Sequence, residues 1–169
     1  MNRFSRLLLL LTLAVALPGC QRQEEAGPLV LSGRLFVFNY RIAIATYLVT
    51  LSRSAALPEG SIIEATFENP QKGAPLVLRQ KVFPVETRIT LQSPPVHCVV
   101  KDRPYAVGIR LFAADGRLLQ SLETTVTSSD DQTILPAKPL VVGPLYAPNP
   151  DVFRGDGSTD FASERACPT

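Results

Sequence analysis

The chain has 169 residues, with 17 basic and 15 acidic side chains and a formal net charge of +2 at pH 7. This near balance excludes the strong positive field with which proteins collect nucleic acid, and it implies no anionic partner. The length is typical of one domain built around one hydrophobic core.

The amino terminus has the layout of an export signal. Two basic residues, Arg3 and Arg6, precede an apolar run from Leu7 to Leu17. This run has about 11 residues, whereas a helix needs roughly 20 to cross a bilayer. The pattern therefore predicts a removable signal and not a membrane span.

The signal ends in Leu17-Pro18-Gly19-Cys20, which resembles the lipobox of bacterial lipoproteins, although Pro18 is unusual in its position. The resemblance implies that residues 1–19 are cleaved off and that Cys20 carries a diacylglycerol anchor. An ordinary signal cleaved elsewhere is the alternative. Gln21 follows the cysteine, and in this class a residue other than Asp there implies an outer-membrane anchor with the domain in the periplasm.

Residues 20–28 are polar and lack periodicity, which predicts a lipidated tether. From Leu29 to about Val142, apolar and polar residues mostly alternate, as in strands with one buried face. Frequent prolines separate the runs, where they cost little. The sequence thus predicts an all-β domain over 29–143, a small β-sandwich of about seven or eight short strands. The clearest alternating runs contain Ile63, Ala65 and Phe67; Ile89 and Leu91; Tyr105, Val107, Ile109 and Leu111; and Leu118, Leu122 and Val126.

One segment breaks the alternation, because residues 35–51 are apolar almost throughout. Their β-branched and aromatic residues favour one long or two short buried strands, with a short helix as the alternative. Arg34 and Arg41 are interpreted as surface or edge charges. Further along, Asp115-Gly116 predicts a hairpin turn, because Gly supplies positive φ without steric cost.

After Val142 the chain becomes rich in Pro, Gly and Asp, which predicts a loosely ordered tail over 144–169. The triplet Arg154-Gly155-Asp156 is short enough to recur by chance. The spaced aspartates lack the twelve-residue loop with a final Glu that a calcium-binding EF-hand requires. Neither feature is interpreted as functional.

The residues offer little for catalysis. His97 is the one histidine of the chain, and it precedes Cys98. A structural zinc ion needs about four ligands, and adjacent residues on a strand point apart, so His97 is interpreted as structural. The chain contains no Trp and none of the common nucleophile, zinc-protease or phosphate-binding motifs. We therefore predict no enzyme, no cofactor, no metal and no small-molecule substrate. The carboxylates within strand-like runs are interpreted as solvent-facing: Glu64, Glu68, Glu86 and Glu123.

Two cysteines remain once Cys20 is assigned to the lipid. In an oxidising compartment Cys98 and Cys167 form a possible disulfide, which would close a loop of about 70 residues and stabilise the fold by roughly 4 kcal/mol. A buried free thiol at Cys98 with an unpaired Cys167 is the alternative.

Three motifs follow one another along the chain: Ala56-Leu57-Pro58-Glu59-Gly60 running into Ser61–Phe67, Tyr105-Ala106-Val107 with Ile109-Arg110, and Asp115-Gly116-Arg117-Leu118-Leu119. Their order resembles the YscW/YbaY type of lipoprotein over about residues 54–142. The implied fold is a small β-sandwich, and for the pilotin members the resemblance implies binding of a secretin subunit and its delivery to the outer membrane. The long apolar segment before residue 54 and the segment after 144 depart from that pattern.

These observations together predict a lipid-anchored envelope binding or assembly factor, with a pilotin-like chaperone of an outer-membrane secretin as its specific form. The predicted partners are the membrane, through the lipid anchor, and a secretin or another envelope protein. A housekeeping envelope lipoprotein with a structural or maintenance role is the alternative.

Overall fold

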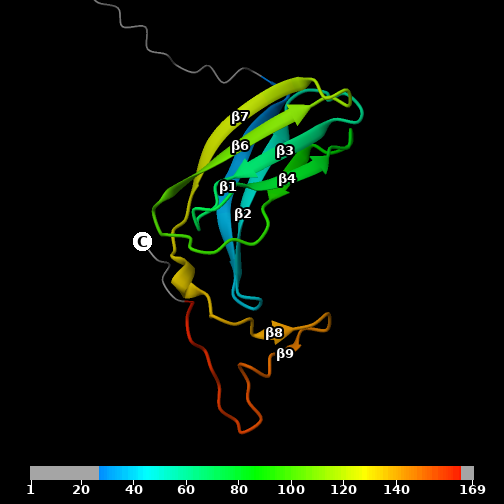
Figure 1. Cartoon of the computed structure of the whole chain (residues 1–169). Coiled ribbons are helices and arrows are strands. Elements are labelled where there is room, and N and C mark those ends of the chain that lie inside the picture. Colours follow the sequence, from blue (N-terminus) through cyan, green and yellow to red (C-terminus); the bar gives the residue numbers. More distant parts are fainter. Residues whose placement is uncertain (1–26, 165–169) are drawn as a thin grey trace, which may run out of the picture.

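The computed structural model describes residues 27–164, which form two antiparallel sheets that pack together, with a small third sheet at one end (Figure 1). The predicted β-sandwich is therefore confirmed. The first sheet has the order β1-β2-β5, with β1 at Leu29–Asn39, β2 at Ile44–Arg53 and β5 at Arg88–Gln92. The second has the order β4-β3-β6-β7, with β3 at Ile62–Phe67, β4 at Leu76–Lys81, β6 at Pro104–Phe112 and β7 at Leu118–Thr127.

The core lies between the two sheets and follows from the alternation of side chains along each strand. In β3, for example, Ile63, Ala65 and Phe67 are all fully buried, while Glu64 and Thr66 between them are partly exposed. Burial of apolar area of this kind is the main favourable term in folding, at about 25 cal/mol per Å². The largest fully buried side chains are Tyr47, Tyr105, Phe67, Leu29, Leu51, Ile63, Ile89, Leu91, Ile109, Leu111, Leu135 and Val49.

The apolar segment 35–51 forms strands, and the helical alternative is wrong. Its residues belong to β1 and β2, which pair over Leu29–Asn39 and Ile44–Arg53 around a tight turn. Burial alternates along β2: Tyr47, Val49 and Leu51 are fully buried, and Leu48 and Thr50 between them are partly exposed. The sequence does not show this alternation, because apolar residues such as Leu48 also occupy the outer face.

The hairpin predicted at Asp115-Gly116 joins β6 to β7. Gly116 has a φ of 85°, and the backbone N–H of Ala113 donates to the carbonyl of Arg117 at 2.9 Å. The Asp115 carboxylate accepts a bond from the Arg117 N–H at 3.0 Å. The Gly116 conformation and these bonds confirm the turn.

Residues 144–164, where composition predicts a loosely ordered tail, make defined contacts. The predicted boundary near 143 falls inside a hairpin formed by β8 (Val141–Val142) and β9 (Ala147–Pro148). The Asn149 side chain donates to the Pro139 carbonyl at 2.6 Å, and Val152 is fully buried. This order rests on hydrogen bonds between distant residues, which leave no periodic pattern in the sequence.

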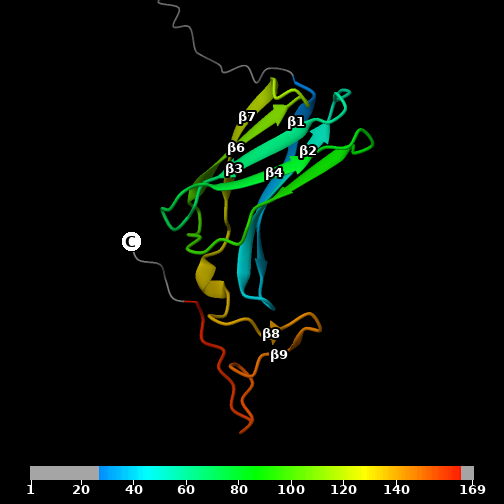
Figure 2. The same cartoon turned by 45° about the vertical axis from the view of Figure 1, so that its right-hand side comes forward.

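The body is elongated, with the start of β1 at one end and the β8–β9 hairpin at the other (Figures 1 and 2). A single turn of 3-10 helix, Gln132–Ile134, lies between β7 and this hairpin. The turn between β1 and β2 meets the hairpin, where the N–H of Leu140 donates to the Arg41 carbonyl at 2.8 Å. Within residues 27–164, no helix has the length and apolar character needed to span a bilayer.

Candidate binding groove between β1 and β7

Strands β1 and β7 are edge strands of different sheets, and side chains connect them where backbone pairing is absent. The Gln120 side-chain amide accepts a hydrogen bond from the Leu29 N–H at 3.0 Å and donates one to the Leu29 carbonyl at 2.8 Å. These are the two bonds that a residue of a neighbouring strand would exchange with Leu29. Gln120 is only 7% exposed, so its amide substitutes for a strand partner at a buried point of the edge.

A second side-chain bond crosses between the strands further along. Arg34 Nη1 donates to Thr124 Oγ1 at 2.7 Å. Arg34 pairs with Val49, which is fully buried, so the arginine originates on the inward face of β1. A bulge between Leu31 and Gly33 shifts the register by one residue and places Arg34 on that face.

A groove of about 300 Å³ opens between the two strands. Aliphatic side chains of β1, β6 and β7 form most of its surface, and polar groups lie among them. A concave, largely apolar surface with a few polar groups is the usual form of a binding site, and a sheet edge can accept an extended peptide as an added strand. The groove is lined by Gly27, Leu29, Val30, Leu31, Ser54, Ile109, Gln120, Leu122, Glu123 and Thr124.

Arg34 and Gln120 were not among the candidates that the sequence analysis selected. Gln120 left a signal, because the sequence pattern places it on the same face as the apolar Leu122 and Val126. The prediction that Leu118 shares this face is wrong, because a register shift in β6 and β7 pairs Leu118 with Phe112 and leaves it 51% exposed. A polar residue at a buried position needs hydrogen-bond partners, and here they are the backbone groups of Leu29. Arg34 was missed because a bulge decides its face, and the one sign of that bulge in the sequence is the isolated Gly33.

His97 lies away from this groove and contacts the end of the described chain. Its Nδ1 is 2.8 Å from Glu164 Oε1, and the other carboxylate oxygen of Glu164 accepts a bond from the Gln132 side chain at 2.8 Å. No group of three or more His, Cys, Asp or Glu side chains within 27–164 could hold a metal ion. The contacts of His97 attach the segment near Glu164 to the sandwich.

Cys98 is disulfide-bonded. Cys20 and Cys167 lie outside the described residues, so the lipid anchor and the pairing of Cys98 with Cys167 stay predictions. The contact of His97 with Glu164 brings the chain close to Cys98 three residues before Cys167.

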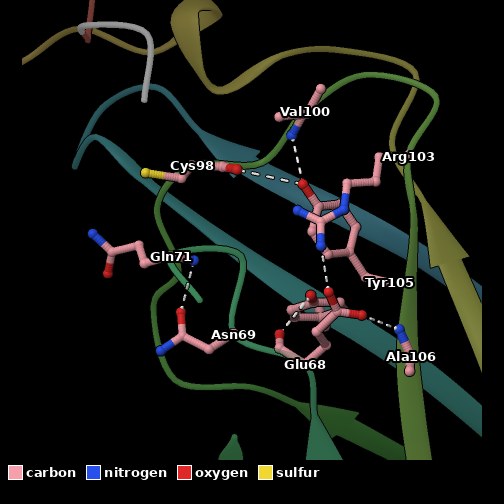
Figure 3. A network of polar contacts seen from close by, with 9 residues as sticks. Glu68, Asn69, Gln71, Cys98, Val100, Arg103, Tyr105 and Ala106 are labelled. Atoms are coloured by element: carbon pink, nitrogen blue, oxygen red, sulfur yellow. Dashed lines mark hydrogen bonds and ion pairs between the residues drawn. The ribbon is translucent and has the colours of Figure 1, made fainter. Parts of the chain in front are cut away.

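Glu68 is the centre of a polar network that supports the core (Figure 3). One carboxylate oxygen accepts a bond from Arg103 Nη2 at 2.6 Å and the other from the Ala106 N–H at 2.9 Å. Arg103 also lies over the Tyr105 ring, 4.5 Å from its centroid. The Tyr105 hydroxyl in turn donates to the Cys98 carbonyl at 3.3 Å, which ties the loop before β6 to the sandwich.

Of the three other carboxylates interpreted as solvent-facing, two form contacts that support the fold and one is exposed. Glu64 forms an ion pair with Arg110 across β3 and β6. Glu86 Oε2 accepts a bond from the Phe83 N–H at 2.8 Å. Glu123 is exposed and lies opposite Gly108 on the outer face of the second sheet.

The Arg154-Gly155-Asp156 triplet forms a tight turn. The Asp156 carboxylate accepts bonds from the backbone N–H and hydroxyl of Ser158 at 2.9 and 2.7 Å, and these bonds lower its pKa. Arg154 Nη2 lies 3.7 Å from the Asp160 carboxylate. Both charged residues of the triplet therefore make side-chain contacts within their own loop.

The buried hydroxyl of Tyr47 predicts how the free energy of unfolding depends on pH. Its ring is fully buried and its hydroxyl donates to the Glu68 carbonyl at 2.8 Å. Burial raises the pKa of Tyr47 well above its ordinary value of 10.0, and the charge of Glu68 raises it further. Above pH 10 the unfolded chain releases this proton while the folded chain retains it. The free energy of unfolding should therefore fall with pH, by up to about 1.4 kcal/mol per pH unit from this residue.

Urea denaturation of the wild type and of Tyr47→Phe between pH 8 and 11 measures this contribution. Phenylalanine has no proton to release, so the decline above pH 10 should be shallower in the variant. Parallel curves for the two proteins would contradict the assignment to Tyr47.

The chain matches no protein-family model, and a search of curated proteins finds no match either. The resemblance to the YscW/YbaY type of lipoprotein therefore stays a prediction. The arguments for function rest on the residues themselves.

Proposed function

We propose that this protein is a lipid-anchored binding or assembly factor of the bacterial envelope and not an enzyme. The observation that carries the proposal is the ending Leu17-Pro18-Gly19-Cys20 behind a short apolar signal. An acyl anchor at Cys20 restricts the domain to a membrane surface, and the domain binds a partner there. We place the anchor in the outer membrane, with the domain in the periplasm.

The position of the groove supports this proposal. Gly27, the first described residue, lines the groove between β1 and β7. A tether of seven residues from Cys20 spans at most about 25 Å, so the anchor keeps the groove close to the membrane. This arrangement suits a factor that receives a membrane-directed partner.

The anchor is tested by replacing Cys20 with serine. We expect the wild type to incorporate an alkyne-labelled fatty acid and to sediment with outer-membrane fractions. The C20S variant should incorporate no label and should leave those fractions, because serine has no thiol for lipid transfer. Gln23→Ser, in the predicted tether, is the matched control and should keep the label, because it retains the Cys20 thiol. Equal labelling of wild type and C20S would remove the lipid anchor from the proposal.

The pilotin-like form of the proposal names an outer-membrane secretin as the partner and needs its own test. Deletion of the gene should reduce the amount of multimeric secretin in the outer membrane, and wild-type but not C20S protein should restore it. Unchanged secretin multimers would remove the pilotin role. That result would leave the alternative of a maintenance lipoprotein.

A further inference from the structure

We propose that the edge of β1 beside the groove binds an extended partner segment that carries a carboxylate. The segment would add as a strand along β1, and its carboxylate would pair with Arg34. This inference rests on the proposed binding function and names the site and the chemistry of the partner.

The first step concerns the backbone of β1. Leu29 directs both its N–H and its carbonyl away from β2, and the Gln120 amide satisfies both. Backbone groups of a strand point alternately to its two sides, so Leu31 directs its own pair to the same edge. Among residues 27–164, the hydrogen bonds that join β1 to β7 are formed by side chains. An added strand would replace the Gln120 amide with peptide groups and extend the pairing along the edge.

The second step concerns charge. Arg34 donates to the Thr124 hydroxyl, and no ion pair within residues 27–164 includes it. By contrast, Arg110 pairs with Glu64 across β6 and β3, and Arg103 pairs with Glu68 beside the ends of these strands. A guanidinium forms its strongest hydrogen bonds with a carboxylate, so Arg34 selects an acidic partner over a basic one.

The third step concerns the side chains that flank the edge. Leu31 and Leu122 give the groove apolar walls, and the outer face of β1 exposes Val30 at 52% and Leu35 at 48%. An added strand would cover apolar surface on both sides. The expected partner therefore has apolar residues at alternate positions and one acidic residue in the same series.

An inward-pointing charge and a bulge also protect edge strands from unwanted pairing, and Arg34 with its neighbouring bulge fits that role. The two roles differ in what they predict. A charge that only protects the edge prevents self-association and discriminates little between acidic and basic peptides. A charge that takes part in binding makes the protein prefer peptides of the opposite charge.

The test uses full-length lipidated protein in detergent and the fluorescent peptide Thr-Val-Thr-Val-Thr-Glu-Thr, with a second peptide that carries Lys in place of Glu. Fluorescence anisotropy should give about tenfold tighter binding of the acidic peptide to the wild type. Arg34→Glu should reverse the preference, and Arg34→Gln should abolish it. Arg88→Glu, on the exposed edge strand β5, is the matched control and should keep the wild-type preference. Circular dichroism confirms that each variant is folded.

Equal binding of the two peptides to the wild type would overturn the inference, as would the same preference in Arg34→Glu. Self-association of Arg34→Gln, together with equal binding of the two peptides by the wild type, would assign Arg34 to edge protection alone. These failures leave the lipid anchor and the assembly role untouched, because fatty-acid labelling and secretin localisation test those independently.

Discussion

Replacing Tyr47 with alanine is expected to lower the free energy of unfolding by about 3–5 kcal/mol, a large part of the 5–15 kcal/mol typical of a domain. The ring is fully buried and lies 4.4 Å from Phe36 and 5.3 Å from Phe67, centroid to centroid. Truncation removes these contacts and leaves a cavity between the sheets. Urea denaturation followed by circular dichroism measures the loss.

Tyr47→Phe separates the ring from its hydroxyl. This variant keeps the aromatic packing and removes only the bond to the Glu68 carbonyl, so it should cost about 1 kcal/mol at neutral pH. A loss below about 1 kcal/mol for the alanine variant would show that the sheets close over the vacated space, contrary to the packing described here.

The second large effect is expected at the disulfide. Cys98 is disulfide-bonded, and with Cys20 assigned to the lipid, Cys167 is its predicted partner. A loop of about 70 residues lowers the entropy of the unfolded chain enough to stabilise the fold by about 4 kcal/mol. Cys98→Ser and Cys167→Ser should each lose a similar amount in urea denaturation, and the double variant should lose no more than either one.

Two measurements check the disulfide independently. Mass spectrometry of the unreduced protein should detect a peptide pair that joins Cys98 to Cys167 and that separates on reduction. Reduced wild type should unfold at the same urea concentration as the double variant. If the double variant lost the sum of the two single-variant losses, the pairing would be contradicted. Once one cysteine is replaced the disulfide is gone, so the second substitution should cost nothing further.

Much of the fold could be predicted from local features of the sequence. Alternating residues such as Ile63, Ala65 and Phe67 mark one face of a strand, and Asp115-Gly116 marks a turn, wherever the rest of the chain lies. The segment 35–51 could not be decided in the same way, because apolar side chains occupy both faces of its strands. Leu35 on the outer face of β1 is 48% exposed, whereas the neighbouring Phe36 packs against Tyr47 in the core. The pairing of β2 with β5 resolves the ambiguity.

The candidate groove could not be predicted, because its polar contacts join residues far apart in the chain. Leu29 and Gln120 are 91 positions apart, and Arg34 and Thr124 are 90 apart. The bulge between Leu31 and Gly33 determines which face Arg34 occupies, and the isolated Gly33 alone does not fix the register of the strand. The sequence analysis selected neither Gln120 nor Leu29, and no local pattern links the two residues.

The sequence by itself determined that the chain folds as a β-sandwich, because burial on one face requires a period of two and Gly is suited to the positive φ of tight turns. Only the tertiary structure decided which edges lie side by side and that residues 144–164 have defined contacts. Those features depend on hydrogen bonds such as Gln120 to Leu29 and Asn149 to Pro139. Such bonds form only after packing has brought their groups together.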